Sequence, residues 1–234
     1  MILRNARILI KIFKFNQTDE FIEQSAVKMN KQIFLKWLKL NVTLFSGAFL
    51  LTFIIVQLFP VQMVALEKGW ANLISETHPG LKQVSEYGSE LELFGYILVW
   101  NSVSLLICFI VCLLITSPVI SPFLGFFYGT VLFTGPLRGH VLTTKDLIFI
   151  PIKVSFFIIT ITFASALGTE IFGIKPERKP LINYFKKSFT RLWYIPKPER
   201  NWRDAFAENK KEFMLFAVTI AVLLLLGAWF EVYG

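Results

Sequence analysis

Residues 93–116 read LFGYILVWNSVSLLICFIVCLLIT, a run of 24 residues without a charged side chain. A helix rises about 1.5 Å per residue, so about 20 residues cross the ~30 Å hydrocarbon core of a bilayer. The whole chain is 55% apolar and only 17% charged, whereas soluble domains contain about 25% charged residues. The run therefore predicts a transmembrane helix.

Apolar runs of similar length recur along the rest of the chain. They cover about 40–58, 123–137, 147–172 and 213–230. The run 123–137 is short for a straight crossing and follows Ser117-Pro118 and Ser121-Pro122, which we expect to form a tight uncharged turn. Two interpretations stay open for this run: a span that begins inside the turn, or a segment of which part re-enters the membrane. The predicted fold class is an all-α membrane protein with about five transmembrane helices.

Polar and basic segments divide this membrane chain. The expected divisions are a basic amphipathic segment 1–38, a four-span core 39–173 with an external segment 61–92, a basic-aromatic segment 174–212 and a final span 213–234. In the first segment Ile8, Ile12 and Phe15 are separated by lysines and arginines, a pattern typical of a helix that lies in the membrane interface.

The distribution of positive charge predicts the orientation. Segment 1–39 holds eight lysines and arginines and segment 174–212 holds eleven, whereas 61–92 and 138–146 hold two each and Lys153 lies within a span. Basic residues accumulate on the cytoplasmic side of membrane proteins. We therefore expect five spans, a cytoplasmic N-terminus and an external C-terminus. The net charge of +8 is better explained by this topology and by anionic lipid headgroups than by nucleic acid.

The segment 174–212 alternates basic and aromatic residues around prolines. Its candidate docking residues are Arg191, Trp193, Tyr194 and Trp202. One interpretation is an interfacial segment anchored by aromatic rings and by long cationic side chains. The alternative is a docking surface for a cytoplasmic partner.

Small residues recur at every fourth position in two of the predicted spans. They are Ser117, Ser121, Gly125 and Gly129, and then Thr160, Ala164 and Gly168. On a helix each set forms a smooth ridge that lets another backbone approach closely. These residues are therefore predicted to pack helices. A substrate path or hinge is the alternative, because Pro118, Pro122 and Pro151 could break helices at membrane depth.

Lys153 and Asn101 form the candidate polar site within the membrane. Lys153 lies six residues into the fourth predicted span and Asn101 eight residues into the second, counted from the same side. A cation at mid-bilayer costs about 2.5–3.5 kcal/mol on insertion scales. Either Lys153 extends outward to water and lipid phosphate, or it joins an internal polar cluster or ion path in which Asn101 is a hydrogen-bond partner.

The sequence contains no recognisable catalytic or metal-binding motif. Cys108 and Cys112 lie on one face of a span, where packing is the expected role, and His78 and His140 lie in different loops. No nucleophile is paired with a base and no phosphate-binding loop is present. We therefore expect a protein that is not an enzyme and that has no cofactor.

Residues Tyr96 to Gly173 resemble the stage II sporulation protein M family of integral membrane proteins. The resemblance lies in Asn101-Ser102-Val103, in the stretch Gly125 to Gly135 and in the stretch Ala164 to Gly168. The layout is also similar, with a basic N-terminus, five spans and a basic loop before the last span. The resemblance implies a non-enzymatic scaffold that recruits partners.

Two functional hypotheses follow. The first is a multi-pass accessory or scaffold subunit that packs with other membrane proteins in a larger complex. The second is a permease or channel component with a polar site near Lys153 and Asn101. Both are compatible with a homo-oligomer.

Overall fold

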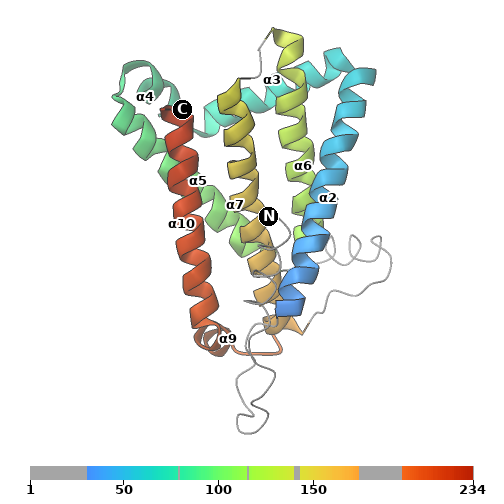
Figure 1. Ribbon diagram of the computed structural model, residues 1–234, viewed down its shortest axis with the longest axis vertical. Helices are drawn as coiled ribbons and strands as arrows, with labels where there is room; N and C mark the ends of the chain where they lie inside the picture. Colours follow the sequence, from blue (N-terminus) through green and yellow to red (C-terminus); the bar gives the residue numbers. More distant parts are fainter. Residues whose placement is uncertain (1–30, 79, 115, 140–142, 174–196, 234) are drawn as a thin grey trace, which may run out of the picture.

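Helices account for the secondary structure in the computed structural model of the chain, which describes residues 31–78, 80–114, 116–139, 143–173 and 197–233 (Figure 1). No strand occurs in these ranges. The elements are α2 (Lys31–Leu58), α3 (Pro60–Thr77), α4 (Leu81–Tyr87), α5 (Glu90–Leu113), α6 (Ser117–Thr134), η1 (Pro136–Arg138), α7 (Thr144–Phe172), α9 (Trp202–Glu208) and α10 (Lys210–Val232).

Five of these helices are long and apolar enough to cross a membrane: α2, α5, α6 with η1, α7 and α10. They confirm the predicted fold class of an all-α, multi-pass integral membrane protein. The helices run further than the apolar runs at most of their ends. Residues 31–38, assigned from sequence to an interfacial segment, form the first turns of α2, and the preceding thirty residues lie outside the described ranges.

The third of these helices begins earlier than the apolar run 123–137 suggested. The helix α5 ends at Leu113, and Ser117 is already the first residue of α6. The prediction of a turn at the two Ser-Pro pairs was therefore wrong, and the span begins inside the stretch that we assigned to the turn. Pro118 is tolerated there because the first N–H groups of a helix have no partner within it.

The helix α7 is the centre of the bundle, and α2, α5, α6 and α10 all pack against it. In Figure 1, α5 and α10 lie on one side of α7 and α2 and α6 on the other. The helix α3 runs across one end of the bundle and α9 lies at the opposite end. We call these ends the α3 end and the α9 end.

The most extensive contact in the bundle joins α2 and α6. Asn41 bonds to Ser121, 80 residues later, and Gly125 lies against the backbone of Phe45. This constant offset means that the two helices run parallel. A Cβ at Gly129 would lie 2.9 Å from Cβ of Thr52, so the small residues allow the two backbones to approach closely.

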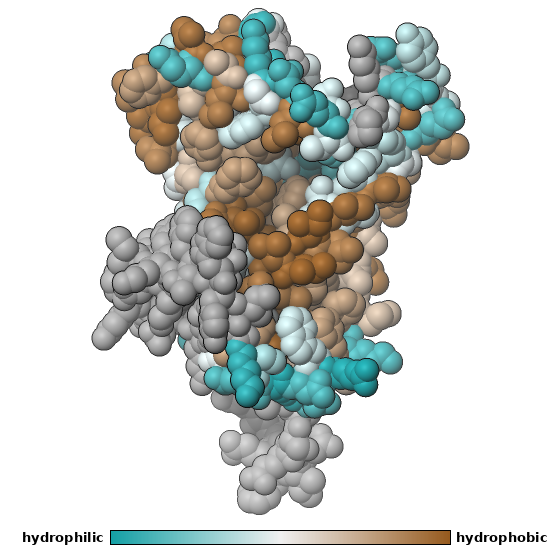
Figure 2. Space-filling model, turned by 180° about the vertical axis from the view of Figure 1, so that it is seen from behind, coloured by the Kyte–Doolittle hydropathy of each residue, from teal (hydrophilic) through white to brown (hydrophobic). Residues whose placement is uncertain are grey.

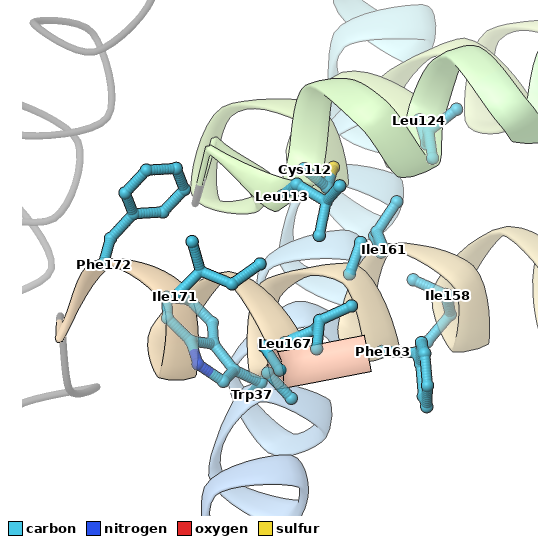
Figure 3. Packing of buried hydrophobic residues seen from close by; sticks show 13 residues of the cluster. Trp37, Cys112, Leu113, Leu124, Ile158, Ile161, Phe163, Leu167, Ile171 and Phe172 are labelled. Atoms are coloured by element: carbon cyan, nitrogen blue, oxygen red, sulfur yellow. The ribbon is translucent and has the colours of Figure 1, made fainter. Parts of the chain in front are cut away.

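Apolar side chains from several helices converge on α7 near the α9 end. Figure 3 shows Cys112 and Leu113 of α5 and Trp37 of α2 beside Leu167 and Ile171 of α7. Four of these five side chains are at most 1% exposed, and Leu113 is 5% exposed. The outer helices bury much less of their length. Only 17% of the most apolar window is buried in α5 and in α10, against 44% in α7.

The surface is banded as expected for a membrane protein. Figure 2 shows hydrophobic side chains over the middle of the molecule and hydrophilic side chains towards both ends. At the α3 end, Trp70 of α3 lies against the rings of Phe126 and Phe127 of α6. The amphipathic α3 therefore lies across the end of the bundle instead of extending away from it.

Candidate functional site

Asn41 joins three helices through buried hydrogen bonds. Its Nδ2 donates to Oγ1 of Thr162 on α7 at 3.1 Å, and its Oδ1 accepts from Oγ of Ser121 on α6 at 2.9 Å. Towards the α9 end, Nε1 of Trp37 donates to Oγ1 of Thr169 at 2.9 Å. Polar groups in an apolar interior must be paired, so these bonds specify how α2 sits against α6 and α7.

The two predicted ridges of small residues are both buried inside the bundle. Ser117, Ser121, Gly125 and Gly129 lie on α6, and Thr160, Ala164 and Gly168 lie on α7. The hydroxyl of Thr160 donates to the carbonyl of Phe156 on its own helix at 2.7 Å, and the Ser117 hydroxyl has no partner within the described ranges. The first ridge faces α2, as its contacts above show.

Lys153 makes an ion pair with Glu231, near the end of α10. Lys153 Nζ lies 2.9 Å from Glu231 Oε2, and the two side chains are 17% and 30% exposed. The ammonium also lies 4.4 Å from the centre of the Phe149 ring. Lys153 therefore extends towards the α3 end, where it meets a carboxylate of the chain itself.

Asn101 lies at the same depth as Lys153, but in the described part of the chain the two side chains are not hydrogen-bonded to each other. Ser165 Oγ bonds to the carbonyl of Cys112 at 3.5 Å, an offset of 53 residues between the parallel helices α7 and α5. With the same offset of 53 residues, Asn101 on α5 lies beside Val154 on α7, one residue from Lys153. Its Nδ2 is buried and has no hydrogen-bond partner among the described residues. The structure thus brings Lys153 to Glu231 and leaves the Asn101 amide as a separate buried donor.

The helix α9 is fastened to the end of α7. The backbone N–H groups of Glu199 and Arg200 donate to the carbonyl of Ile171 at 2.9 and 3.2 Å. Asn209 Nδ2 donates to Glu170 Oε2 at 2.6 Å, and Arg200 pairs with Glu208. Gly173 has φ +65°, and a side chain there would overlap the Glu199 carboxylate. These contacts fix where the chain returns to the bundle.

Of the four candidate docking residues, the structure describes Trp202. Its ring meets Phe172 of α7 edge to face, with centroids 5.7 Å apart, and the residue is 37% exposed. Trp202 thus anchors α9 to α7. The other three, Arg191, Trp193 and Tyr194, lie outside the described residues.

A further ion pair joins α3 to η1, the short helix that follows α6. Arg138 Nη2 lies 3.0 Å from Glu67 Oε1, and the Glu67 side chain is 9% exposed. The other carboxylate oxygen, Oε2 of Glu67, is buried without a hydrogen-bond partner in the described ranges. Because breaking a buried pair leaves an uncompensated charge, this contact holds α3 across the α3 end.

Two apolar cavities lie on either side of α10 near the α9 end. The larger, about 860 Å³, is walled by α2, α7 and α10, including Phe34, Phe163 and Phe216. The smaller, about 230 Å³, lies between α5 and α10 and is closed by Thr160 of α7. The rings of Phe163 and Phe216 stack at 4.3 Å, and Phe216 lines both cavities.

The described part of the chain offers little that could perform chemistry. Within it, no group of three His, Cys, Asp or Glu side chains is placed to hold a metal ion. Cys108 and Cys112 are free thiols on the inner side of α5. The polar groups that the fold does assemble are ion pairs and hydrogen bonds between helices.

Sequence reasoning missed Asn41, Glu231 and the pair of Glu67 and Arg138. A usable signal existed for two of them: Asn41 interrupts the first apolar run, and Glu231 ends the last run on the same side as Lys153. The Glu67–Arg138 pair has no such signal, because its two residues lie in separate connecting segments.

The comparisons with known proteins agree with this architecture. Residues 41–234 match the family model for Stage II sporulation protein M. No curated protein and no solved structure matches the chain. The family match covers all five long helices apart from the first ten residues of α2. The chain therefore belongs to the stage II sporulation protein M family of membrane proteins.

Proposed function

We propose that this protein is a non-enzymatic membrane subunit that holds other membrane proteins in a larger complex. The observation that carries the proposal is the contrast between a fixed centre and open outer faces. In the centre, the hydrogen bonds of Asn41 and Trp37 and the close contacts of the small residues of α6 hold the helices together. The outer helices α5 and α10 bury only 17% of their apolar windows. Such faces suit contact with further helices.

The proposed orientation puts the α9 end in the cytoplasm. Nineteen of the 24 lysines and arginines lie in segments 1–39 and 174–212, and α2 and α10 begin at the α9 end. The positive-inside rule favours this arrangement. The basic-aromatic segment 174–212 would then face cytoplasmic partners, and an odd number of spans would leave the C-terminus outside.

A pull-down of the tagged protein from its native membrane in mild detergent tests this proposal. We expect stoichiometric membrane partners, identified by mass spectrometry, and their loss on substitution of exposed α10 residues such as Met214 or Val218. The matched control is Leu224, which also lies on α10 but is only 8% exposed and faces the bundle. Recovery of the protein alone, together with turnover or flux, would contradict the proposal.

A permease or channel component is the second candidate, and the observation that favours it is the polar group near the α3 end. The Lys153–Glu231 ion pair lies within the bundle of long helices, as does Asn101 Nδ2, which is buried without a hydrogen-bond partner among the described residues. Intramembrane charges often mark ion or substrate paths. In reconstituted vesicles, this candidate requires a flux that Lys153→Leu and Asn101→Leu reduce. A flux that is absent, or unchanged by both substitutions, rejects that site.

A further inference from the structure

The larger cavity has the volume and the depth that a bound acyl chain requires. Its volume of about 860 Å³ falls within the ~300–1,000 Å³ range of ligand pockets. Along α10 it extends from Glu212 to Thr219, which is about 10 Å at 1.5 Å per residue. One leaflet of the hydrocarbon core is about 15 Å thick. The cavity therefore covers most of the depth of the leaflet at the α9 end.

Below its mouth, the part of this cavity's wall that the structure describes is almost entirely apolar. Phe34, Leu38, Ile159 and Leu215 line it. Thr219 Oγ1, the one hydroxyl among the described lining residues, already donates to the carbonyl of Leu215 at 2.8 Å. Water would find no partners on such a wall, whereas an acyl chain would replace lost contacts between side chains. The deep part of the cavity therefore suits a hydrocarbon chain.

The mouth of the cavity carries charges of both signs. Lys31 lines it from the first turn of α2 and Glu212 from the first turn of α10. Lys211 is exposed and lies one helical turn from Leu215, on the same face. Lys31 and Glu212 each already make an interaction within the chain. A lipid headgroup would share or replace those interactions.

We infer that this cavity binds a zwitterionic phospholipid with a primary ammonium group. One acyl chain fills the apolar part, the phosphate lies at Lys31 and Lys211, and the ammonium donates hydrogen bonds to the Glu212 carboxylate. A quaternary ammonium has no N–H to donate, and a glycerol headgroup has no positive charge. Glu212 therefore discriminates between headgroups, while Lys31 attracts any phosphate. The site does not depend on the partner subunits of the proposed function.

Native mass spectrometry of the full-length protein tests this site. The probe is a mixed micelle with equal parts of phosphatidylethanolamine, phosphatidylglycerol and phosphatidylcholine, all with oleoyl chains. We expect the first bound lipid to be phosphatidylethanolamine, with a preference of roughly tenfold, as one charge-assisted hydrogen bond provides. Glu212→Gln should abolish this preference. Asp204→Asn, which removes an exposed acid of α9 at the same end, should leave it unchanged.

A second pair of variants distinguishes this cavity from general lipid contact. Thr219→Phe fills the cavity and should abolish retention of the first lipid. Val222→Phe places the same ring on an exposed position of α10 and should not. Equal retention of all three lipids, unaffected by Thr219→Phe, would mean an adventitious additive only and overturn the inference. If the wild type retains no lipid, the inference also fails. Should Thr219→Phe not fold, the Glu212→Gln comparison still decides.

Discussion

A methyl group added at Gly125 would overlap the carbonyl oxygen of Phe45 and lie 3.2 Å from Cβ of Ala48, whereas one at Gly47 would meet nothing within 4 Å. Overpacking costs about 1–3 kcal/mol, and in an open helix alanine is favoured over glycine by about 0.8–1.0 kcal/mol. We expect Gly125→Ala to lower the thermal unfolding temperature in detergent and Gly47→Ala to preserve or raise it. Equal shifts for the two variants would show that α2 and α6 are not in this close contact.

Lys153 and Glu231 should behave as a coupled pair. Lys153→Met leaves the partly buried Glu231 carboxylate without its partner, so we expect it to destabilise the protein more in the wild type than in a Glu231→Gln background. Contacting residues show coupling energies of about 0.5–3 kcal/mol, and the partial exposure of both side chains points to the lower part of that range. A double-mutant cycle of unfolding free energies measures the coupling. Additive effects would mean that the pair does not form.

Lys153 illustrates how far single residues can be interpreted from sequence. A lysine inside an apolar run is conspicuous because charge is costly in lipid. Its partner Glu231 is not conspicuous in the sequence, because it lies on α10 and 78 residues separate the two. Which side chains meet depends on the rotation and register of packed helices, which hydropathy along the chain does not contain.

At the scale of elements, Asn41 is expected to control the attachment of α2. Asn41→Leu removes both interhelical hydrogen bonds and leaves the Ser121 and Thr162 hydroxyls in an apolar interior. Such bonds contribute about 0.6 kcal/mol on average in membranes, with a maximum near 1.7, so we expect a loss of about 1–2 kcal/mol in unfolding free energy. Ser121→Ala breaks one bond and should have a smaller effect. Thr43→Val is the control, because that exposed hydroxyl bonds only to the carbonyl of Lys39 on its own helix.

The docking of α9 depends on Gly173, and Gly139 provides a matched control. Both have positive φ, +65° and +79°, but only at Gly173 would a side chain meet other atoms. Alanine in the left-handed region costs about 1–2 kcal/mol. We expect Gly173→Ala to exceed Gly139→Ala in destabilisation and to increase proteolysis near Glu199, because its carboxylate must move. Equal proteolysis in the two variants would argue against the contact.

The long helices could be predicted from sequence, but their ends and their packing could not. The apolar run 213–230 lies inside α10, Lys210–Val232, because the helix continues beyond the apolar run at both ends. The first Ser-Pro pair was misassigned because proline favours both turns and the first turn of a helix, where Pro118 lies. Pro122 lies further inside α6. The central position of α7 is a property of packing, since its apolar run does not differ from the others in kind.

For the whole molecule, the orientation can be tested with single cysteines. Cys108 and Cys112 are first replaced by serine or alanine, and a cysteine is then placed at the exposed Tyr87, the last residue of α4, or at the exposed Asn201 before α9. A membrane-impermeant thiol reagent should label position 87 from outside, and position 201 only after the membrane is opened. Labelling at both positions without opening would rule out the five-span arrangement, and the reverse pattern would invert it.

The attachment of α2 to α7 also constrains how the chain is made. Asn41 and its partner Thr162 are 121 residues apart, and a ribosome adds about 5–20 residues per second. For about 6–24 seconds after Asn41 leaves the ribosome, its amide has no Thr162 to bind, because Thr162 has not yet left the ribosome. The helix α2 thus enters the bilayer with the Asn41 Nδ2 group unpaired with Thr162. This group must be shielded by the insertion machinery or by water until α7 is inserted.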